Sequence, residues 1–224
     1  SHLDDVSTGH VGGPVPSVEL KLMSVPSMGY LVTDTSHAGV PCRGRGEVCL
    51  RGPSVFRGYY VGESPVDADG WLHSGDIGLF TETGALQLID RIKNIFKLAQ
   101  GEFVAPEKVE AKLQDCGFVA QAFVYGDSLR NYLVAVVVPD FEAFAAAAGP
   151  NAAGREVTPG LVDKIVEQMR VATRRMPKYQ VPKKILVTAD EFTPENGLLT
   201  PTFKVKRKLV EDKYMREINL MYND

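Results

Sequence analysis

Residues 69–108 carry the clearest chemical pattern in the sequence. Asp76 stands among closely spaced glycines, in what the sequence predicts to be a turn, and a short apolar stretch then ends at Arg91. Lys93 and Lys97 follow. An acid can accept hydrogen bonds from ribose hydroxyls, as acids do in other nucleotide folds, and arginine and lysine bind phosphate. The order of acid, arginine and lysines therefore predicts a nucleotide site.

Three sequence blocks extend this pattern in a fixed order: DGWLHSGDIG at 69–78, DRIKNIFKLAQGEFVAPEKVE at 90–110 and NGLLTPTFKVKR at 196–207. They resemble the motifs of the adenylate-forming enzymes, which include acyl-CoA synthetases, luciferases and peptide-synthetase adenylation domains. The variants here are most similar to those of eukaryotic long-chain fatty acyl-CoA synthetases. The resemblance extends from about residue 9 to residue 224.

The resemblance implies an α+β fold, in which a β-rich, barrel-like subdomain precedes a small mixed α/β C-terminal domain. Residues 1–90 would be the truncated last subdomain of an N-terminal domain. Residues 91–224 would be a mobile domain that carries a hinge and the adenylation lysine. The sequence contains no GxxxxGK[ST] pattern or comparable Ser/Thr/Gly-rich loop. The resemblance explains this absence, because it implies that the phosphate-binding loop of the family lies upstream. We therefore expect these 224 residues to be inactive by themselves.

The resemblance also implies a two-step reaction on a fatty acid, ATP and CoA. The acid first attacks the α-phosphate of ATP, and the thiol of CoA then displaces AMP from the acyl adenylate. The first step needs no base, because a carboxylate is ionised at neutral pH. It needs cations that stabilise oxygens gaining charge. Mg²⁺ is expected with ATP, bound by a residue upstream, and the missing N-terminal domain is the expected protein partner.

Site residues follow from the same resemblance. Lys204 matches the adenylation lysine, although Phe203 stands where the family commonly has glycine; the alternative is a solvated basic run before a helix. Asp76 matches the ribose-binding acid, with a turn-capping aspartate as the alternative. Arg91 matches an arginine that contacts ribose or phosphate, with a surface ion pair to Asp90 as the alternative.

Three further residues match the mobile parts of the family. Lys93 matches the hinge residue, and the alternative is a solvated strand end. Lys97 and Gly101 match the loop used in thioester formation, where glycine would permit close approach of the pantetheine arm. The alternative for this loop is an exposed β-hairpin.

Composition limits the other classes of function. A net charge of −3 gives no general attraction to nucleic acid. The longest apolar run, at 132–138, is too short to span a bilayer. Three cysteines without a CxxC pair argue against a disulfide scaffold or a zinc site, so no metal site is predicted. We expect a cytoplasmic protein, with any membrane association through segments outside this sequence.

Hydrophobic periodicity predicts the elements that must position these residues. Short strands at 18–23, 47–50 and 84–89 indicate an antiparallel barrel-like or sandwich-like unit. After residue 90 we expect strands at 119–125, 133–138 and 184–188, and a loop at 149–154. Helices are expected from Pro106, at 141–148, from Thr158-Pro159 through Met176, and at 207–217.

Two other functions remain open from the sequence. One is a non-catalytic module that binds an adenylate or a partner. The other is an adenylate-forming ligase that takes a different carboxylic acid.

Overall fold

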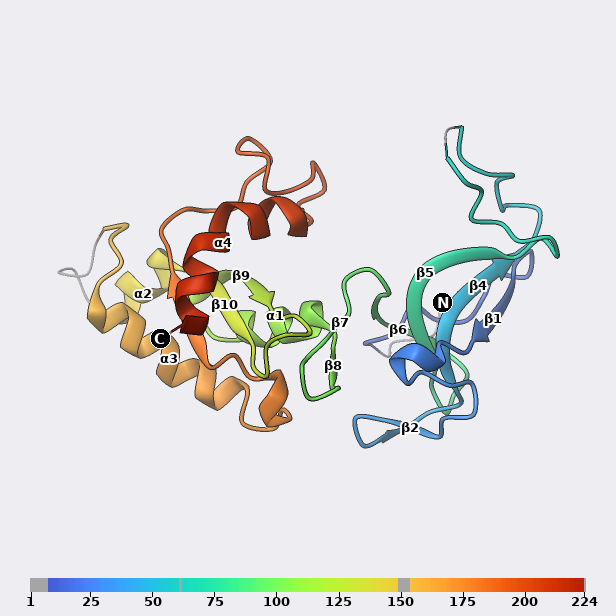
Figure 1. Cartoon of the computed structure of the whole chain (residues 1–224), viewed down its shortest axis with the longest axis horizontal. Coiled ribbons are helices and arrows are strands. Elements are labelled where there is room, and N and C mark those ends of the chain that lie inside the picture. The colour runs from blue at the N-terminus through green and yellow to red at the C-terminus, as the bar shows by residue number, and fades with distance from the viewer. Residues whose placement is uncertain (1–7, 61, 149–153, 224) are drawn as a thin grey trace. The chain divides into compact units, whose positions relative to one another are not determined.

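The computed structural model describes residues 8–60, 62–148 and 154–223. The chain divides into two compact units, Ser1–Ile95 and Phe96–Asp224 (Figure 1). The division therefore follows Ile95, whereas the sequence led us to expect it after residue 90. Most of the predicted loop at 149–154 lies outside the described residues.

An antiparallel sheet with the strand order β1-β4-β5-β6 forms the centre of the first unit. Its strands are β1 (Glu19–Met23), β4 (Arg45–Arg51), β5 (Leu72–Phe80) and β6 (Leu86–Arg91). The short strands β2 (Ser36–His37) and β3 (Val40–Pro41) pair separately, and η1 (Pro26–Met28) is a single 3-10 turn. This β-rich unit and the mixed unit of helices and strands after it confirm the expected fold class. The described strands make an open sheet and not a closed barrel, which corrects only the barrel-like form.

Strand β5 corrects a second expectation, because Asp76 lies inside it and not in a turn. The glycines that suggested a turn serve the sheet in other ways. A Cβ on Gly78 would lie 2.8 Å from Val48 Cγ2, so glycine allows the strands to pack closely there. Gly75 has a φ of +72°, in the left-handed region that favours glycine. Pairing with strands on both sides outweighs the local turn preference.

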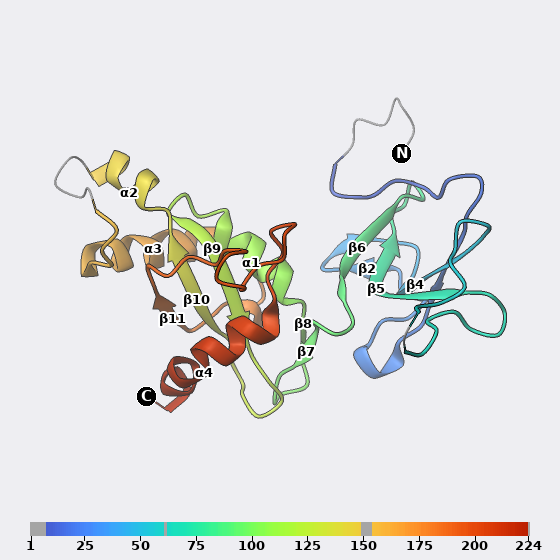
Figure 2. The same ribbon diagram turned by 90° about the horizontal axis from the view of Figure 1, so that it is seen from above.

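The second unit is built on a sheet with the order β11-β10-β9 (Figure 2). Strand β10 (Val134–Pro139) is antiparallel to β9 (Val119–Tyr125) and parallel to β11 (Lys184–Val187). Successive side chains of a strand point to opposite faces. In β10 every residue is buried, so the sheet is covered on both faces.

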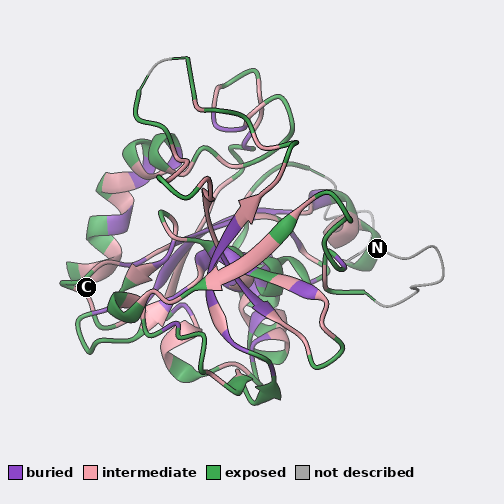
Figure 3. Cartoon of the chain, turned by 90° about the vertical axis from the view of Figure 1, so that its right-hand side faces the viewer, coloured by how far each residue is buried: buried purple, intermediate pink, exposed green. Residues whose placement is uncertain are grey.

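Each face of this sheet has its own hydrophobic core. Ala135 and Val137 of β10 belong to a core with α1 (Pro106–Gln114), α2 (Phe141–Ala148) and α3 (Pro159–Ala172). Val134, Val136 and Val138 belong to a second core with α4 (Arg207–Asn223). Burial in Figure 3 accordingly follows the strands, while the surrounding loops are mostly exposed or intermediate.

The helix boundaries reflect ordinary capping chemistry. Pro106 occupies the first turn of α1, where its missing N–H is harmless. The Thr158 hydroxyl accepts a hydrogen bond from Leu161 N–H at 3.3 Å, which caps α3. Helix α3 ends at Ala172, so Met176 lies beyond it, contrary to the predicted spacing. Within the described ranges, no helix is both long and apolar enough to cross a membrane.

Three short elements complete the second unit. Strands β7 (Phe96–Lys97) and β8 (Phe103–Val104) form a hairpin just before α1, and η3 (Lys178–Gln180) precedes β11. The hairpin carries Lys97 and Gly101, and Lys204 lies in the loop before α4. The fold therefore sets the positions of Lys97 and Lys204 separately.

Candidate functional site

Asp76 and Arg91 face each other across strands β5 and β6. They are register partners in the antiparallel pair, and Arg91 Nε lies 2.9 Å from Asp76 Oδ1. The Asp76 side chain is 23% exposed and that of Arg91 63%, so the guanidinium remains accessible. The neighbouring Asp90 accepts the Arg91 backbone N–H through Oδ1 at 2.6 Å.

A buried carboxylate supports the residues just before Asp76. Glu47 of β4 accepts the Gly75 backbone N–H at 3.1 Å through Oε1, and its Oε2 lies 2.9 Å from His73 Nδ1. The other ring nitrogen, Nε2, lies 3.4 Å from Asp67 Oδ2. The hydrogen bond to Glu47 raises the pKa of His73, since both flanking carboxylates favour the protonated ring.

Glu47, Cys49 and His73 are the one group of possible metal ligands among the described residues. Their donor atoms lie within 4.8 Å of one another. Burial raises the pKa of the Cys49 thiol to about 11, so it is protonated at neutral pH. Glu47 already has donors on both oxygens. These contacts satisfy the group without an ion, and we assign no metal to it.

Lys93 lies in the turn that follows β6. Its side chain is exposed. Ile92 N–H donates to Gly75 C=O at 2.8 Å, and Asn94 N–H donates to Arg91 C=O at 2.9 Å. The division between the two units follows Ile95. Lys93 is thus an exposed residue between an anchored strand end and a unit boundary.

Lys97 and Gly101 belong to the β7–β8 hairpin, so this segment has the hairpin form that the sequence left open. Gly101 has a φ of +94°, and its N–H donates to Leu98 C=O at 2.8 Å. The exposed Lys97 ammonium lies 5.4 Å from the centre of the Phe103 ring. Ala99 N–H donates to Arg130 C=O at 2.9 Å, which attaches the hairpin turn to the β9–β10 loop.

Lys204 is exposed on a short loop closed by the bridge between Leu199 and Val205. The Thr200 hydroxyl accepts the Lys204 N–H at 3.1 Å, and Thr200 N–H donates to Lys204 C=O at 2.8 Å. Phe203 has a φ of +59° and is 74% exposed. The left-handed backbone explains why glycine suits this position.

A buried ion pair anchors the chain three residues after Lys204. Arg207 Nη1 lies 2.7 Å from Glu110 Oε1, and Nη2 donates to Val124 C=O at 2.7 Å. Val124 N–H in turn donates to Glu110 Oε1 at 2.8 Å. Burial raises the pKa of Glu110, although Arg207 opposes this shift. The pair ties the start of α4 to α1 and β9.

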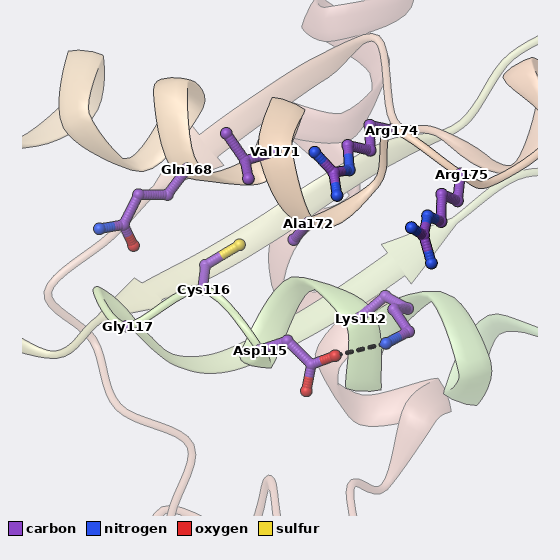
Figure 4. A pocket seen from close by; sticks show the side chains of 9 residues that line it. All are labelled: Lys112, Asp115, Cys116, Gly117, Gln168, Val171, Ala172, Arg174 and Arg175. Atoms are coloured by element: carbon purple, nitrogen blue, oxygen red, sulfur yellow. Dashed lines mark hydrogen bonds and ion pairs between the residues drawn. The ribbon is translucent and has the colours of Figure 1, made fainter.

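A cavity of about 620 Å³ lies between the ends of α1 and α3 (Figure 4). Lys112, Arg174 and Arg175 line it, and Lys112 is paired with Asp115 at 2.6 Å. Both helices end here, and helix C-termini attract cations. Lys112 lies in the last turn of α1, and Arg174 and Arg175 follow the end of α3.

The predicted site residues are distributed over both units. The sheet of the first unit brings Asp76 and Arg91 together, close in sequence to Lys93. In the second unit, the β7–β8 hairpin and the loop before α4 lie apart in both Figures 1 and 2. Sequence reasoning missed Glu47, because its relation to His73 and Gly75 depends on strand pairing. The available signal was an acid directly before the apolar residues 48–50 of a predicted strand, and Glu47 is buried there in β4.

The sequence of the chain is similar to those of long-chain acyl-CoA synthetases. The chain is 44% identical to the peroxisomal long chain acyl-CoA synthetase 6 of Arabidopsis thaliana, over 98% of this chain and 32% of that protein. It is 40% identical to the human long-chain-fatty-acid–CoA ligase 6, with the same two coverages. It therefore spans about a third of the length of these relatives.

The structure of the chain is similar to solved structures of adenylation domains. The adenylation domain of a carboxylate reductase from Mycobacterium chelonae superimposes with a TM-score of 0.78 and 35% identity, over 93% of this chain and 32% of that one. The corresponding Segniliparus rugosus domain, in complex with AMP and a carboxylic acid, gives 0.75 and 34%, with the same coverages. A family profile described as the AMP-binding enzyme C-terminal domain matches residues 93–224. The chain therefore belongs to the AMP-binding enzyme C-terminal domain family.

Proposed function

We propose that the longer protein containing this chain is an ATP-dependent long-chain fatty acid–CoA ligase. It converts a fatty acid and ATP to an acyl adenylate and pyrophosphate, and then transfers the acyl group to the thiol of CoA with release of AMP. The observation that carries this proposal is the 44% identity, over 98% of the chain, with the Arabidopsis long chain acyl-CoA synthetase.

Asp76 and Arg91 are proposed to bind the nucleotide. An ionised carboxylate offers about four acceptor positions, so Asp76 can hold Arg91 through Oδ1 and still accept from ribose hydroxyls. Arg91 restricts the rotation of this carboxylate. Its own guanidinium is 63% exposed and can donate to a phosphate or to the ribose.

Lys204 is proposed to act in adenylate formation. Its ammonium would lie between the fatty carboxylate and the α-phosphate, where two negative groups must approach each other. A cation there stabilises the charge that develops on the transferring oxygens. The hydrogen bonds of Thr200 to both sides of the Lys204 backbone support the role by limiting where the side chain begins.

Lys93, Lys97 and Gly101 are proposed to act in the second step. Lys93 would be the hinge about which the C-terminal domain reorients, as residues at element ends often do. Lys97 and Gly101 would then line the path of the CoA thiol. Glycine suits the left-handed backbone at position 101, and because it has no Cβ, no side chain there obstructs the pantetheine arm.

Mg²⁺ is proposed to accompany ATP through residues outside this chain. It prefers six oxygen ligands. The Glu47, Cys49 and His73 group offers one carboxylate, one thiol and one imidazole, and so does not fit this ion.

The proposed partners are the fatty acid, ATP, CoA and an N-terminal domain of the same protein. The cytoplasmic location remains a proposal, with an organelle as the alternative, because the Arabidopsis relatives are named as peroxisomal. A second candidate function is adenylation of a different carboxylic acid. The carboxylate-reductase adenylation domains favour this candidate, because they superimpose on the chain at about a third identity.

ATP–pyrophosphate exchange tests the proposal on the full-length protein, with the 224-residue chain assayed in parallel. Palmitate-dependent exchange in the full-length protein alone is the expected result. Exchange that depends on a short or aromatic acid instead would favour the second candidate. No exchange with any acid, in folded protein, would support a non-catalytic binding module.

A further inference from the structure

Glu47 occupies an unusual place for a carboxylate. Its residue is 8% exposed, in the middle of β4, and it binds two donors that belong to the neighbouring strand. One donor is the ring of His73, and the other is the backbone N–H of Gly75. A buried charge is stable only when such partners compensate for lost hydration. Glu47 therefore fixes residues 73–75 of β5 relative to β4.

The other side of Gly75 is held as well. Its carbonyl accepts the Ile92 N–H at 2.8 Å, while its own N–H is bound by Glu47. The N–H and the C=O of Gly75 are thus both held by hydrogen bonds. Glycine is conformationally free in an unfolded chain, so these bonds help to select its φ of +72°. Asp76 follows directly, so its backbone has a defined direction.

His73 completes the support. Its two ring nitrogens face two different carboxylates, Glu47 at 2.9 Å and Asp67 at 3.4 Å. Both carboxylates can be satisfied together only when both nitrogens carry a proton. Asp67 is itself fixed, because its Oδ1 accepts the backbone N–H groups of Trp71 and Asp69 at 2.8 and 3.0 Å. The ring thus connects the β4 carboxylate to the loop before β5.

We propose that Glu47 and His73 are positioning residues for nucleotide binding, which hold the Ser74–Gly75 peptide, directly before Asp76, so that the Asp76 carboxylate meets the ribose. This inference rests on the proposed function, since it takes Asp76 as the ribose-binding acid. The geometry assigns the two residues an effect on ATP binding. It assigns them no contact with the fatty acid or with CoA.

The test uses Glu47→Gln in the full-length protein. Glutamine keeps the size of the side chain but removes its charge and replaces one acceptor oxygen by a donor nitrogen, so it cannot accept from Gly75 and from a protonated His73 through separate oxygens. The KM for ATP in adenylate formation is expected to rise by about 10- to 100-fold, as for a misplaced binding group. The KM for the fatty acid, and thioester formation from supplied acyl adenylate, are expected to stay at wild-type values.

Glu19→Gln is the matched control. Glu19 is an exposed carboxylate on β1 of the same sheet, paired with Arg51 at 2.6 Å, and its substitution is expected to change neither KM. His73→Gln is the second variant, because it removes one donor and leaves the Gly75 bond to Glu47 in place. If Glu47→Gln does not fold, the KM for ATP of His73→Gln tests the positioning role by itself.

Asp76→Asn distinguishes failure of the positioning role of Glu47 and His73 from failure of the ribose-binding role of Asp76. If Asp76→Asn raises the KM for ATP while Glu47→Gln and His73→Gln leave it unchanged, the positioning role is overturned and the proposed function stands. If none of the three raises it, the ribose role of Asp76 fails as well. An equal loss in both half-reactions, in proportion to lost folded protein, would show general destabilisation and would also overturn the positioning role.

Discussion

Arg91 Nε lies 2.9 Å from Asp76 Oδ1, and the two residues are register partners across β5 and β6. The contact is therefore set by strand pairing. A single-residue slip of register would send one of the two side chains to the opposite face of the sheet. The sheet thus delivers an oriented carboxylate and an accessible guanidinium at one place.

Arg91→Ala is expected to affect nucleotide binding much more than folding. The exposed pair contributes about 0–1 kcal/mol to stability, whereas a charge-assisted contact with ATP contributes about 1.5–3 kcal/mol. The KM for ATP should therefore rise by roughly 10-fold or more, with little change in the thermal midpoint. Steady-state kinetics and thermal unfolding of the same preparation check this. An unfolding midpoint that falls strongly, with KM unchanged, would contradict the nucleotide role.

The Glu110–Arg207 pair predicts a large stability effect in the second unit. Arg207→Met removes the cation from a carboxylate that is 10% exposed and should lower the free energy of unfolding by about 3–5 kcal/mol. Lys208→Met is the control, since the Lys208 side chain is 73% exposed, pairs with Glu211 and Asp212, and its substitution should change little. Urea unfolding of the 224-residue chain measures both. Equal effects of the two variants would mean that the buried pair is not a principal anchor of α4.

Substitution of Phe203 by glycine is expected to increase the stability of the chain. Its φ of +59° costs energy for any residue with a Cβ, and its ring is 74% exposed, so little packing is lost on truncation. Phe203→Gly should stabilise the chain by about 0.5–1 kcal/mol, after the greater freedom of glycine in the unfolded chain is included. Phe203→Ala keeps the backbone strain and should not stabilise. If both variants destabilise alike, the ring makes contacts that matter more than the strain.

His73 predicts a pH dependence of stability. Its pKa is raised above the ordinary value of 6.5, mainly by the hydrogen bond with Glu47. The contribution of the protonated ring is therefore complete below 6.5 and is lost as the pH rises through the higher folded-state value. Denaturant unfolding between about pH 6 and 9 should show the stability advantage of wild type over His73→Gln shrinking with increasing pH. A constant or growing advantage would contradict the assigned contacts.

The sequence predicted elements with strong local signals. Strand β9 and helix α2 match their predicted bounds, because valine and aromatic residues mark the strand and Asp140 caps the helix. Strand β5 was missed, because Gly75 and Gly78 favour a turn locally and only pairing with β4 and β6 makes the segment a strand. Pairing with the neighbouring strands therefore outweighs the local turn propensity of these glycines.

The contacts within the candidate site could not be predicted from the sequence either, because they depend on strand pairing and long-range packing. Resemblance identified Asp76 and Arg91, but their ion pair depends on strand register. The Arg207 contact with Glu110 joins residues 97 positions apart, which no local pattern reveals. Glu47 and His73 were missed as a pair for the same reason, since they meet only across β4 and β5.

Comparison of the two half-reactions in Lys204→Ala and Lys97→Ala, within the full-length protein, tests the central claim most directly. The two lysines lie on separate segments of the second unit, so each is proposed to serve one step. Lys204→Ala should lower adenylate formation by about 100-fold or more and leave thioester formation from supplied acyl adenylate near wild type. Lys97→Ala should show the reverse bias. Equal losses in both half-reactions for Lys204→Ala would contradict its role as the adenylation lysine.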